Sequence, residues 1–285
     1  MMRRVTILFC LLAAGLPALA EWVTHPEMAV LRPRNVLSRQ LERDRLAPVE
    51  TKYQNRHYLF RRSFGLESVQ TATLRITADD YYKLYVNGEF VGMGPAAGTV
   101  DCTYYNVIDL SRYLVKGRNT IAVHTYYQGL VNRVWVSGDN RHGLWLELDV
   151  DGKRVLESDP TFKVRRHAGY SAMGTAGYDT QFLECYDAGA PEVGFARLDF
   201  DDAEWTHAVR HPRGCDYKLV EQPSPMVVTE RIAPVATDLL PSGGLRVDLF
   251  IEYPVLRANT RKYRRHIARI CVFFVFYHLP ASRIQ

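Results

Sequence analysis

Residues 72–95 read ATLRITADDYYKLYVNGEFVGMGP, and residues 104–127 read YYNVIDLSRYLVKGRNTIAVHTYY. In the first stretch Leu74 and Ile76 alternate with polar neighbours, which places apolar and polar side chains on opposite faces of a strand. Asn87-Gly88 stands between two strand-like runs and supplies the positive φ values that a two-residue type I′ turn needs. These stretches therefore predict antiparallel strands joined by tight turns.

The same pattern continues along the chain. Residues 144–150 alternate in hydropathy, Asp151-Gly152 is a second hairpin signal, and residues 153–157 and 161–166 follow as strands. A short helical turn is expected at residues 110–114. Many short strands with Gly and Asn turns, and no long helical period, predict an all-β fold, a jelly-roll-like β-sandwich.

The composition fits a globular protein, because 47% of the 285 residues are hydrophobic and 12% are aromatic. The formal net charge is +5, but the basic excess lies at the two ends of the chain. Residues 251–285 hold seven basic residues against one acidic residue, and Arg3 and Arg4 add two more. A nucleic-acid-binding surface over the whole molecule is therefore not supported.

The first twenty residues resemble a secretion signal. A basic start ending at Arg4 precedes an apolar run from Val5 to Leu16, and Ala18-Leu19-Ala20 provides small residues for cleavage. The apolar run is shorter than the ~20 residues of a membrane span. We expect cleavage after Ala20, export to the periplasm or the medium, and an irregular, charged lead-in over residues 21–56.

Four cysteines then remain: Cys102, Cys185, Cys215 and Cys271. An oxidising compartment permits disulfides, and four cysteines allow three pairings. The Cys185–Cys215 pair is slightly favoured because both residues lie in the predicted sandwich, and free buried thiols are the alternative.

Two ordered blocks of sequence carry a family resemblance. The first is Y-x-L-Y-V-N-G-x-x-V-G-x-G-P from Tyr82, followed by Y-x-x-x-D-L-x-x-x-L-x-x-G-x-N-x-I-A-V from Tyr105. The second is ECYDA at 184–188 with DDAEW at 201–205, although Leu183 and Gly189 depart from the family's G-E-x-Y-D-A-R. Over roughly residues 55–245 the chain resembles the N-terminal β-sandwich domain of bacterial α-L-rhamnosidases.

The resemblance implies a galactose-binding-domain-like sandwich over residues 57–240. The implied role is a carbohydrate-recognition or accessory domain of an exported glycoside hydrolase that acts on rhamnose-containing glycans. The alternative is a structural domain that packs against a downstream catalytic domain. The catalytic carboxylates of this family lie in a helical toroid for which this chain has no room, so no catalytic residue is carried over. Residues 241–285 would begin a further domain or form an atypical basic tail.

Sugar binding needs an aromatic face for the C–H side of a pyranose and polar groups for its hydroxyls. Trp135 lies in a polar stretch, and Trp145 is expected to point away from Leu144, Leu146 and Leu148. Core or inter-domain packing is the competing interpretation for each aromatic residue. The candidate carbohydrate-binding residues are Arg133, Trp135, Asp139, Asn140, Trp145, Tyr104, Tyr105, Glu184, Tyr186 and Asp187.

Other chemistries find little support in the sequence. His207 and His211 are four residues apart, but Pro212 follows and no further metal ligand is placed. The sequence has no phosphate loop, dinucleotide fingerprint or nucleophile elbow. We therefore expect no metal, no cofactor, no nucleic acid and no stable membrane span, with a rhamnose-containing oligosaccharide or glycoside as the partner.

Overall fold

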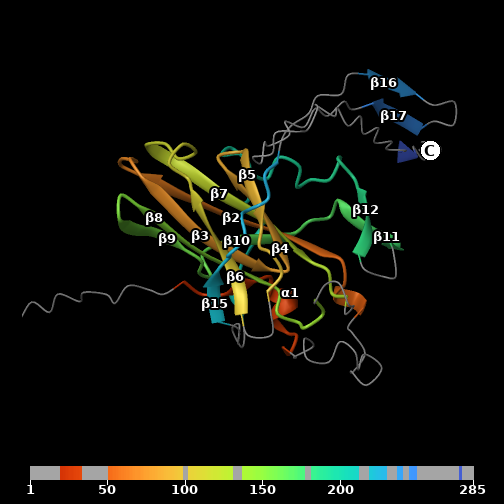
Figure 1. The fold of residues 1–285 in the computed structure, drawn as a ribbon, viewed down its shortest axis with the longest axis horizontal. Coiled ribbons are helices and arrows are strands. Elements are labelled where there is room, and N and C mark those ends of the chain that lie inside the picture. Colours follow the sequence, from red (N-terminus) through yellow and green to blue (C-terminus); the bar gives the residue numbers. More distant parts are fainter. Residues whose placement is uncertain are drawn as a thin grey trace, which may run out of the picture. The chain divides into compact units, whose positions relative to one another are not determined.

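The computed structural model describes residues 20–33, 51–98, 102–130, 137–176, 181–211, 218–229, 236–239, 244–248 and 276–277. The chain divides into two units, Met1–Val227 and Val228–Gln285. Strands dominate the described residues, and the described helices are the short α1 (Pro26–Ala29) and the 3₁₀ turn η2 (Thr51–Tyr53) (Figure 1). The all-β sandwich predicted from the sequence is confirmed.

One layer of the first unit is a seven-stranded sheet. Its order is β14-β1-β8-β3-β6-β15, with β9 paired to β8. The last strand, β15, pairs in parallel with β6, whereas the other pairings are antiparallel. The strands are β1 (Val23–Thr24), β3 (Ala72–Asp79), β6 (Cys102–Asp109), β8 (Gly143–Val150), β9 (Lys153–Glu157), β14 (Val209–Arg210) and β15 (Lys218–Glu221).

The other layer is a six-stranded antiparallel sheet in the order β13-β10-β2-β7-β4-β5. Its two longest strands, β2 and β7, pair along their whole length, from Arg56 opposite Tyr127 to Leu66 opposite Gly117. The strands are β2 (Arg56–Leu66), β4 (Tyr81–Val86), β5 (Glu89–Gly94), β7 (Gly117–Tyr127), β10 (Lys163–Arg166) and β13 (Thr206–His207).

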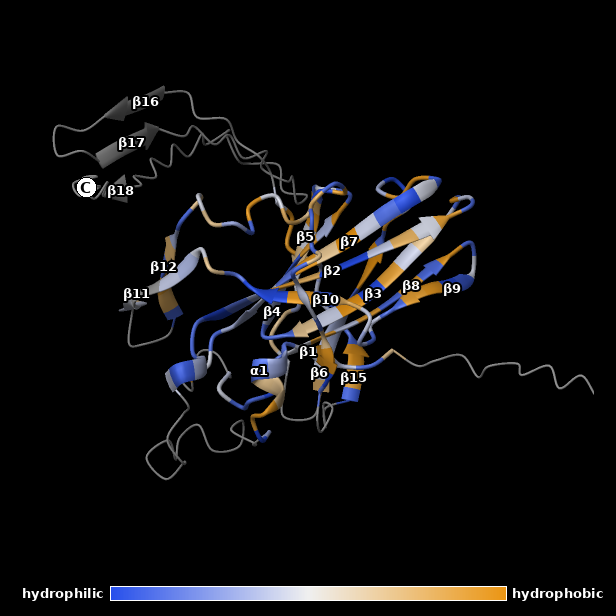
Figure 2. Cartoon of the chain, turned by 180° about the vertical axis from the view of Figure 1, so that it is seen from behind, coloured by the Kyte–Doolittle hydropathy of each residue, from blue (hydrophilic) through white to orange (hydrophobic). Residues whose placement is uncertain are grey.

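Alternation along the strands builds the core between the two sheets. Leu144, Leu146 and Leu148 of β8 are fully buried, and the hydrophobic and hydrophilic residues of this strand alternate in Figure 2. From the facing sheet, Leu84 and Val123 are equally buried. The apolar faces of both sheets thus supply one core, as the sequence alternation predicted.

Both predicted hairpin turns are present. Asn87 and Gly88 have φ values of 51° and 91°, and β4 pairs with β5 on either side of them. Asp151 and Gly152 have φ values of 48° and 76° between β8 and β9. The expected turn at 110–114 also forms, since the backbone N–H groups of residues 113 and 114 both donate to the carbonyl of Leu110.

The lead-in segment differs from the prediction of an irregular wrap. Val23 of β1 pairs with Leu144 and Arg210, so this short strand is part of the seven-stranded sheet. A two-residue strand carries too little alternation to be recognised in sequence, and its pairing is set by distant partners.

A further antiparallel pair, β11 (Tyr170–Ala176) with β12 (Gln181–Tyr186), belongs to the first unit. In the second unit, β16 (Ala236–Leu239), β17 (Gly244–Asp248) and β18 (Phe276–Tyr277) form a three-stranded antiparallel sheet. The division between the two units follows Val227, and the domain boundary at residue 240 stays a prediction. Among the described residues, no helix has the length and apolar character needed to cross a membrane.

Candidate functional site

A cavity of about 680 Å³ lies on the outer face of the six-stranded sheet. Strands β2, β4 and β7 provide one side, the β11–β12 pair another, and residues 93–97 with residues 222–227 a third. Its volume falls within the ~300–1,000 Å³ typical of small-molecule sites. We refer to it as the sheet-face cavity.

Strand alternation determines most of the strand side chains that line this cavity, and the buried Tyr82 is an exception that also reaches the lining. Tyr82 and Leu84 of β4 point into the core, so Tyr81 and Lys83 face outward. On β7 the same rule turns Tyr127 inward and places Tyr126, with His124, in the cavity.

Four rings form a continuous stack along the cavity. The centroids of the His57 and Tyr170 rings are 3.8 Å apart, and the two ring planes meet at 12°. The centroids of the His57 and Tyr126 rings are 4.5 Å apart, with an interplanar angle of 26°. Tyr126 in turn lies parallel to Tyr81, with centroids 6.4 Å apart. Phe182 adds a further aromatic face from β12. The cavity therefore offers extended aromatic surface from both layers that enclose it.

His57, one ring of this stack, contacts a second buried histidine, His124. His57 Nδ1 and His124 Nε2 are 3.0 Å apart, a distance at which one imidazole donates to the other. Burial is the main cause that lowers the pKa of His57 to about 3, with His167 and Lys83 adding to the shift. Burial likewise holds the pKa of His124 well below its usual value. Both imidazoles are therefore neutral near pH 7.

Charged and amide groups complete the lining. Lys83 and Glu184 line the cavity from opposite sides, and neither makes an ion pair within the described part of the chain. Asn55, Gln128 and Gln181 add groups that can donate or accept hydrogen bonds. Glu184 is the one carboxylate among the described lining residues, whereas glycoside hydrolysis usually employs two.

A buried acidic cluster lies beside Tyr81 in the chain. Asp80 Oδ2 accepts hydrogen bonds from Gln128 N at 2.7 Å and Ser137 Oγ at 2.5 Å. Burial raises the pKa of Asp80 to about 6. Asp139 Oδ2 lies 3.3 Å from Arg141 Nη1. Burial, followed by the charge of Asp79, raises the pKa of Asp139 to about 8.

Of the sequence candidates, Asp139 and Asn140 lie outside the lining of the cavity. Asp139 is only 4% exposed, and the side-chain amide of Asn140 donates to the carbonyl of Arg32. Trp135 and Arg133 lie outside the described residues, so their predicted role stays a prediction. Cys185 carries a free thiol in the structure, so the predicted Cys185–Cys215 pairing is not formed.

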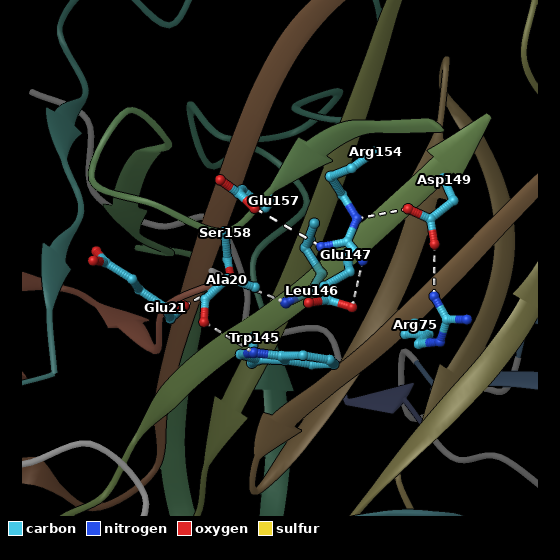
Figure 3. A network of polar contacts seen from close by, with 10 residues as sticks. All are labelled: Ala20, Glu21, Arg75, Trp145, Leu146, Glu147, Asp149, Arg154, Glu157 and Ser158. Carbon is cyan, nitrogen blue, oxygen red and sulfur yellow. Dashed lines mark hydrogen bonds and ion pairs between the residues drawn. The ribbon is translucent and has the colours of Figure 1, made fainter. Parts of the chain in front are cut away.

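Trp145 lies on the other sheet, as Figure 3 shows. It points away from the core as expected, but it is 8% exposed, and its Nε1 donates to the carbonyl of Ala20 at 3.3 Å. Tyr105 covers it from β6, with ring centroids 6.0 Å apart. Tyr105 therefore belongs to this second surface, while Tyr104, one residue earlier on β6, points to the opposite face of that strand, and neither residue lines the cavity.

Next to Trp145 runs a chain of ion pairs. Arg154 contacts Asp149 at 2.6 Å and Glu147 at 2.8 Å, and Asp149 also binds Arg75 at 2.7 Å (Figure 3). These charges satisfy one another across strands β3, β8 and β9.

The candidates on β12 reach the sheet-face cavity in part. Glu184 lines it, while the Tyr186 ring packs behind Tyr170 with centroids 4.9 Å apart. Asp187 accepts from Gly189 N at 2.8 Å and closes a turn. His57, Lys83 and Tyr170 were not predicted as site residues from the sequence. Strand alternation could have indicated Lys83, because Y-x-K at residues 81–83 of β4 places its first and last side chains on the outer face, as H-x-Y at residues 124–126 does on β7.

In the described parts of the chain, no group of three or more His, Cys, Asp or Glu side chains is placed to hold a metal ion. What the cavity presents is aromatic faces edged by polar groups, an arrangement that suits a polar ligand with apolar faces.

Comparison with known families and structures gives consistent matches. The family model for the α-L-rhamnosidase N-terminal domain matches residues 67–235. No curated protein matches the chain. A GH78 family rhamnosidase of Bacillus sp. GL1 is 28% identical with a TM-score of 0.62, over 78% of this chain. An α-L-rhamnosidase from Dictyoglumus thermophilum is 23% identical with a TM-score of 0.53, over 82% of this chain.

The matched regions are small parts of those enzymes. The chain corresponds to 22% of the Bacillus enzyme and 26% of the Dictyoglumus enzyme.

Proposed function

Because the chain belongs to the family of α-L-rhamnosidase N-terminal domains, we propose that it is a carbohydrate-recognition module for rhamnose-containing glycans. In this proposal it acts as the accessory part of an exported rhamnosidase, with hydrolysis carried out by a catalytic domain downstream. The sheet-face cavity is the binding site. The observation that supports this most is the aromatic stack of Tyr81, Tyr126, His57 and Tyr170 along the cavity.

The chemistry of a deoxy sugar fits this lining. Rhamnose carries a methyl group and a C–H face that favour contact with tyrosine and phenylalanine rings, while its hydroxyls need hydrogen-bond partners. Gln128, Asn55 and Gln181 supply amides around the rings, and Glu184 supplies an acceptor. A ligand bound here would bury apolar and polar surface together, as small-molecule sites usually do.

Calorimetric titration of the full chain with a rhamnose-terminated oligosaccharide tests the proposal. Tyr126→Ala removes the ring at the centre of the stack, and we expect it to weaken binding about tenfold, or ~1.4 kcal/mol. Tyr104→Ala is the matched control, because Tyr104 lies on the other sheet. Absence of binding to the wild-type chain would refute the proposal. Equal affinity of the Tyr126→Ala and Tyr104→Ala variants would refute the assignment of the binding site to the sheet-face cavity.

A purely structural sandwich is the second candidate function. It is favoured by the small share of the solved enzymes that the chain represents. In that case a face of the sandwich would pack against a catalytic domain, and no glycan would bind. The same titration separates the two functions.

Export is part of the proposed function, and the N-terminus of the exported protein tests it. Cleavage after Ala20 would remove the carbonyl group that Trp145 Nε1 donates to. We expect the protein recovered outside the cytoplasm to begin at Glu21 by intact-mass measurement. A start at Met1 in the exported protein would contradict this part of the proposal.

A further inference from the structure

Lys83 occupies the middle of the cavity side formed by the sheet. It pairs in register with His124 on β7 and with Met93 on β5, and all three residues line the cavity. Its neighbours in the chain, Tyr82 and Leu84, are buried in the core, so β4 holds the Lys83 backbone firmly.

The ammonium group of Lys83 has no partner within the described part of the chain. Lys83 as a residue is partly buried, and its ammonium group makes no hydrogen bond and no ion pair there. An ammonium group held at a partly buried position without a partner leaves three hydrogen-bond donors available to an incoming anion. The carboxylate on the opposite side, Glu184, forms no ion pair with it either.

The two charges influence different neighbours. Lys83 acts on the imidazoles of His57 and His124, where its positive charge adds to the lowering of their pKa by burial. Glu184 acts on the phenols of Tyr126 and Tyr170, where its negative charge adds to the raising of their pKa by burial. The charge of Asp80 also raises the pKa of Tyr126, but Asp80 already accepts hydrogen bonds from Gln128 N and Ser137 Oγ.

The groups that surround Lys83 at the sheet are therefore neutral histidines and tyrosines. From β2 comes His57, from β7 His124 and Tyr126, and from the β11–β12 pair Tyr170 and Glu184. A negative group that enters the cavity would find a cation with free donors, flanked by aromatic rings. Such a setting strengthens an ion pair compared with one at an open surface.

We propose that the sheet-face cavity takes an acidic glycan, with the carboxylate of a uronic acid paired to Lys83 while the adjoining sugar stacks on the Tyr81–Tyr126 rings. This inference rests on the proposed glycan recognition and narrows its ligand class. In this arrangement the carboxylate of Glu184, on the β12 side, accepts hydrogen bonds from the hydroxyls of the neutral sugar. The like charge of Glu184 disfavours the reversed orientation of the ligand.

The test compares two disaccharides by titration calorimetry of the full chain. One has L-rhamnose linked to glucuronic acid, and the other is the same compound with its carboxyl group reduced to the alcohol. We expect the wild-type chain to bind the acidic disaccharide about tenfold more tightly at low salt. We expect this preference to shrink as ionic strength rises, because salt screens the pair.

Three variants localise the effect. Lys83→Met, which keeps an unbranched side chain, should reduce the preference for the acidic disaccharide to less than twofold. Lys83→Arg should retain the preference. Lys153→Met is the matched control for net charge, because Lys153 is exposed on β9 of the other sheet, and it should behave as wild type.

The outcomes separate this inference from the function on which it rests. Equal binding of both disaccharides by the wild-type chain would overturn the acidic-glycan inference and leave glycan recognition standing. A preference that persists in Lys83→Met would also overturn it. Binding of neither disaccharide would overturn both.

Discussion

Arg61 is a fully buried cation. Its hydrogen bonds hold a segment of the chain over one half of the outer face of the six-stranded sheet. It is 1% exposed, and its guanidinium binds Asp202 at 2.8 Å together with the carbonyls of Phe195, Arg197 and Phe200. These bonds hold the segment around residues 195–202 against the sheet, where Phe195 and Trp205 cover Leu59 and Ala122. The cavity is thereby confined to the other half of the outer face.

Arg61→Lys should lower the free energy of unfolding by about 3 kcal/mol, because lysine cannot reproduce the planar set of donors and leaves several buried acceptors unpaired. Urea denaturation measures this. Arg62→Lys is the control, since Arg62 donates to Thr161 O at an exposed site and its replacement should cost under ~0.5 kcal/mol. Similar losses in both variants would contradict the role given to Arg61.

His142 makes the stability depend on pH. It is fully buried between Thr24 Oγ1 at 2.9 Å and Thr125 Oγ1 at 2.8 Å, and burial holds its pKa well below the usual value. In the unfolded chain its pKa returns to about 6.5, so below pH 6.5 the unfolded state binds a proton that the folded state does not. This group therefore removes stability as the pH falls.

We expect the unfolding free energy of wild type, relative to His142→Gln, to fall by about 2 kcal/mol between pH 7 and pH 5. The raised pKa of Asp139, about 8, acts in the opposite sense, because its stability contribution is lost as the pH rises toward 8. Taking the difference between the two proteins cancels that contribution. A pH-independent difference would contradict a neutral buried His142.

At the scale of elements, the β4–β5 turn is hydrogen-bonded to two other segments of the fold, which its local sequence does not predict. Asn87 adopts a φ of 51° and its amide donates to Tyr113 O and Asn119 Oδ1, while its Oδ1 accepts from Thr120 N. One side chain thus ties the turn to the 110–114 turn and to β7.

Asn87→Val should cost about 3 kcal/mol, because a β-branched residue resists positive φ and the three hydrogen bonds are lost. Asn87→Gly keeps the backbone conformation at little steric cost and should lose less. Melting curves of the two variants measure the difference. An unchanged melting temperature in the valine variant would refute the turn as assigned.

Sequence alternation predicted the long strands and both hairpins well, because each of those signals lies within a few neighbouring residues. It could not place β1, β13 or β14, which are two residues long and are defined by distant partners. The same limit applies to the cavity. Trp145 faces outward as predicted, but residues far away in the chain cover it, whereas Tyr170 reaches His57 through a pairing of strands that no local pattern encodes.

At the scale of the whole molecule, the first unit ends where its last segment closes the cavity. Gln222 Oε1 accepts from Ala96 N at 2.7 Å and from Asn106 Nδ2 at 2.9 Å, which fastens residues 222–227 beside residues 93–97. The division between the two units follows at Val227.

A chain that ends at Val227 should therefore keep its melting temperature within ~3 °C and its affinity for the rhamnose-terminated oligosaccharide. A chain that ends at Val220 loses Gln222 and leaves the Nδ2 group of the buried Asn106 without its acceptor, so it should melt several degrees lower. Equal melting of the two truncated chains would show that the 222–227 segment does not support the fold.

The central claim is that the sheet-face cavity recognises a glycan. The most direct measurement is a crystal structure of the chain soaked with a rhamnose-terminated oligosaccharide. The account predicts sugar density against Tyr126 and Tyr170, within hydrogen-bonding distance of Gln128 or Glu184. Density on the outer face of the seven-stranded sheet, next to Trp145 and Tyr105, with an empty sheet-face cavity, would contradict it.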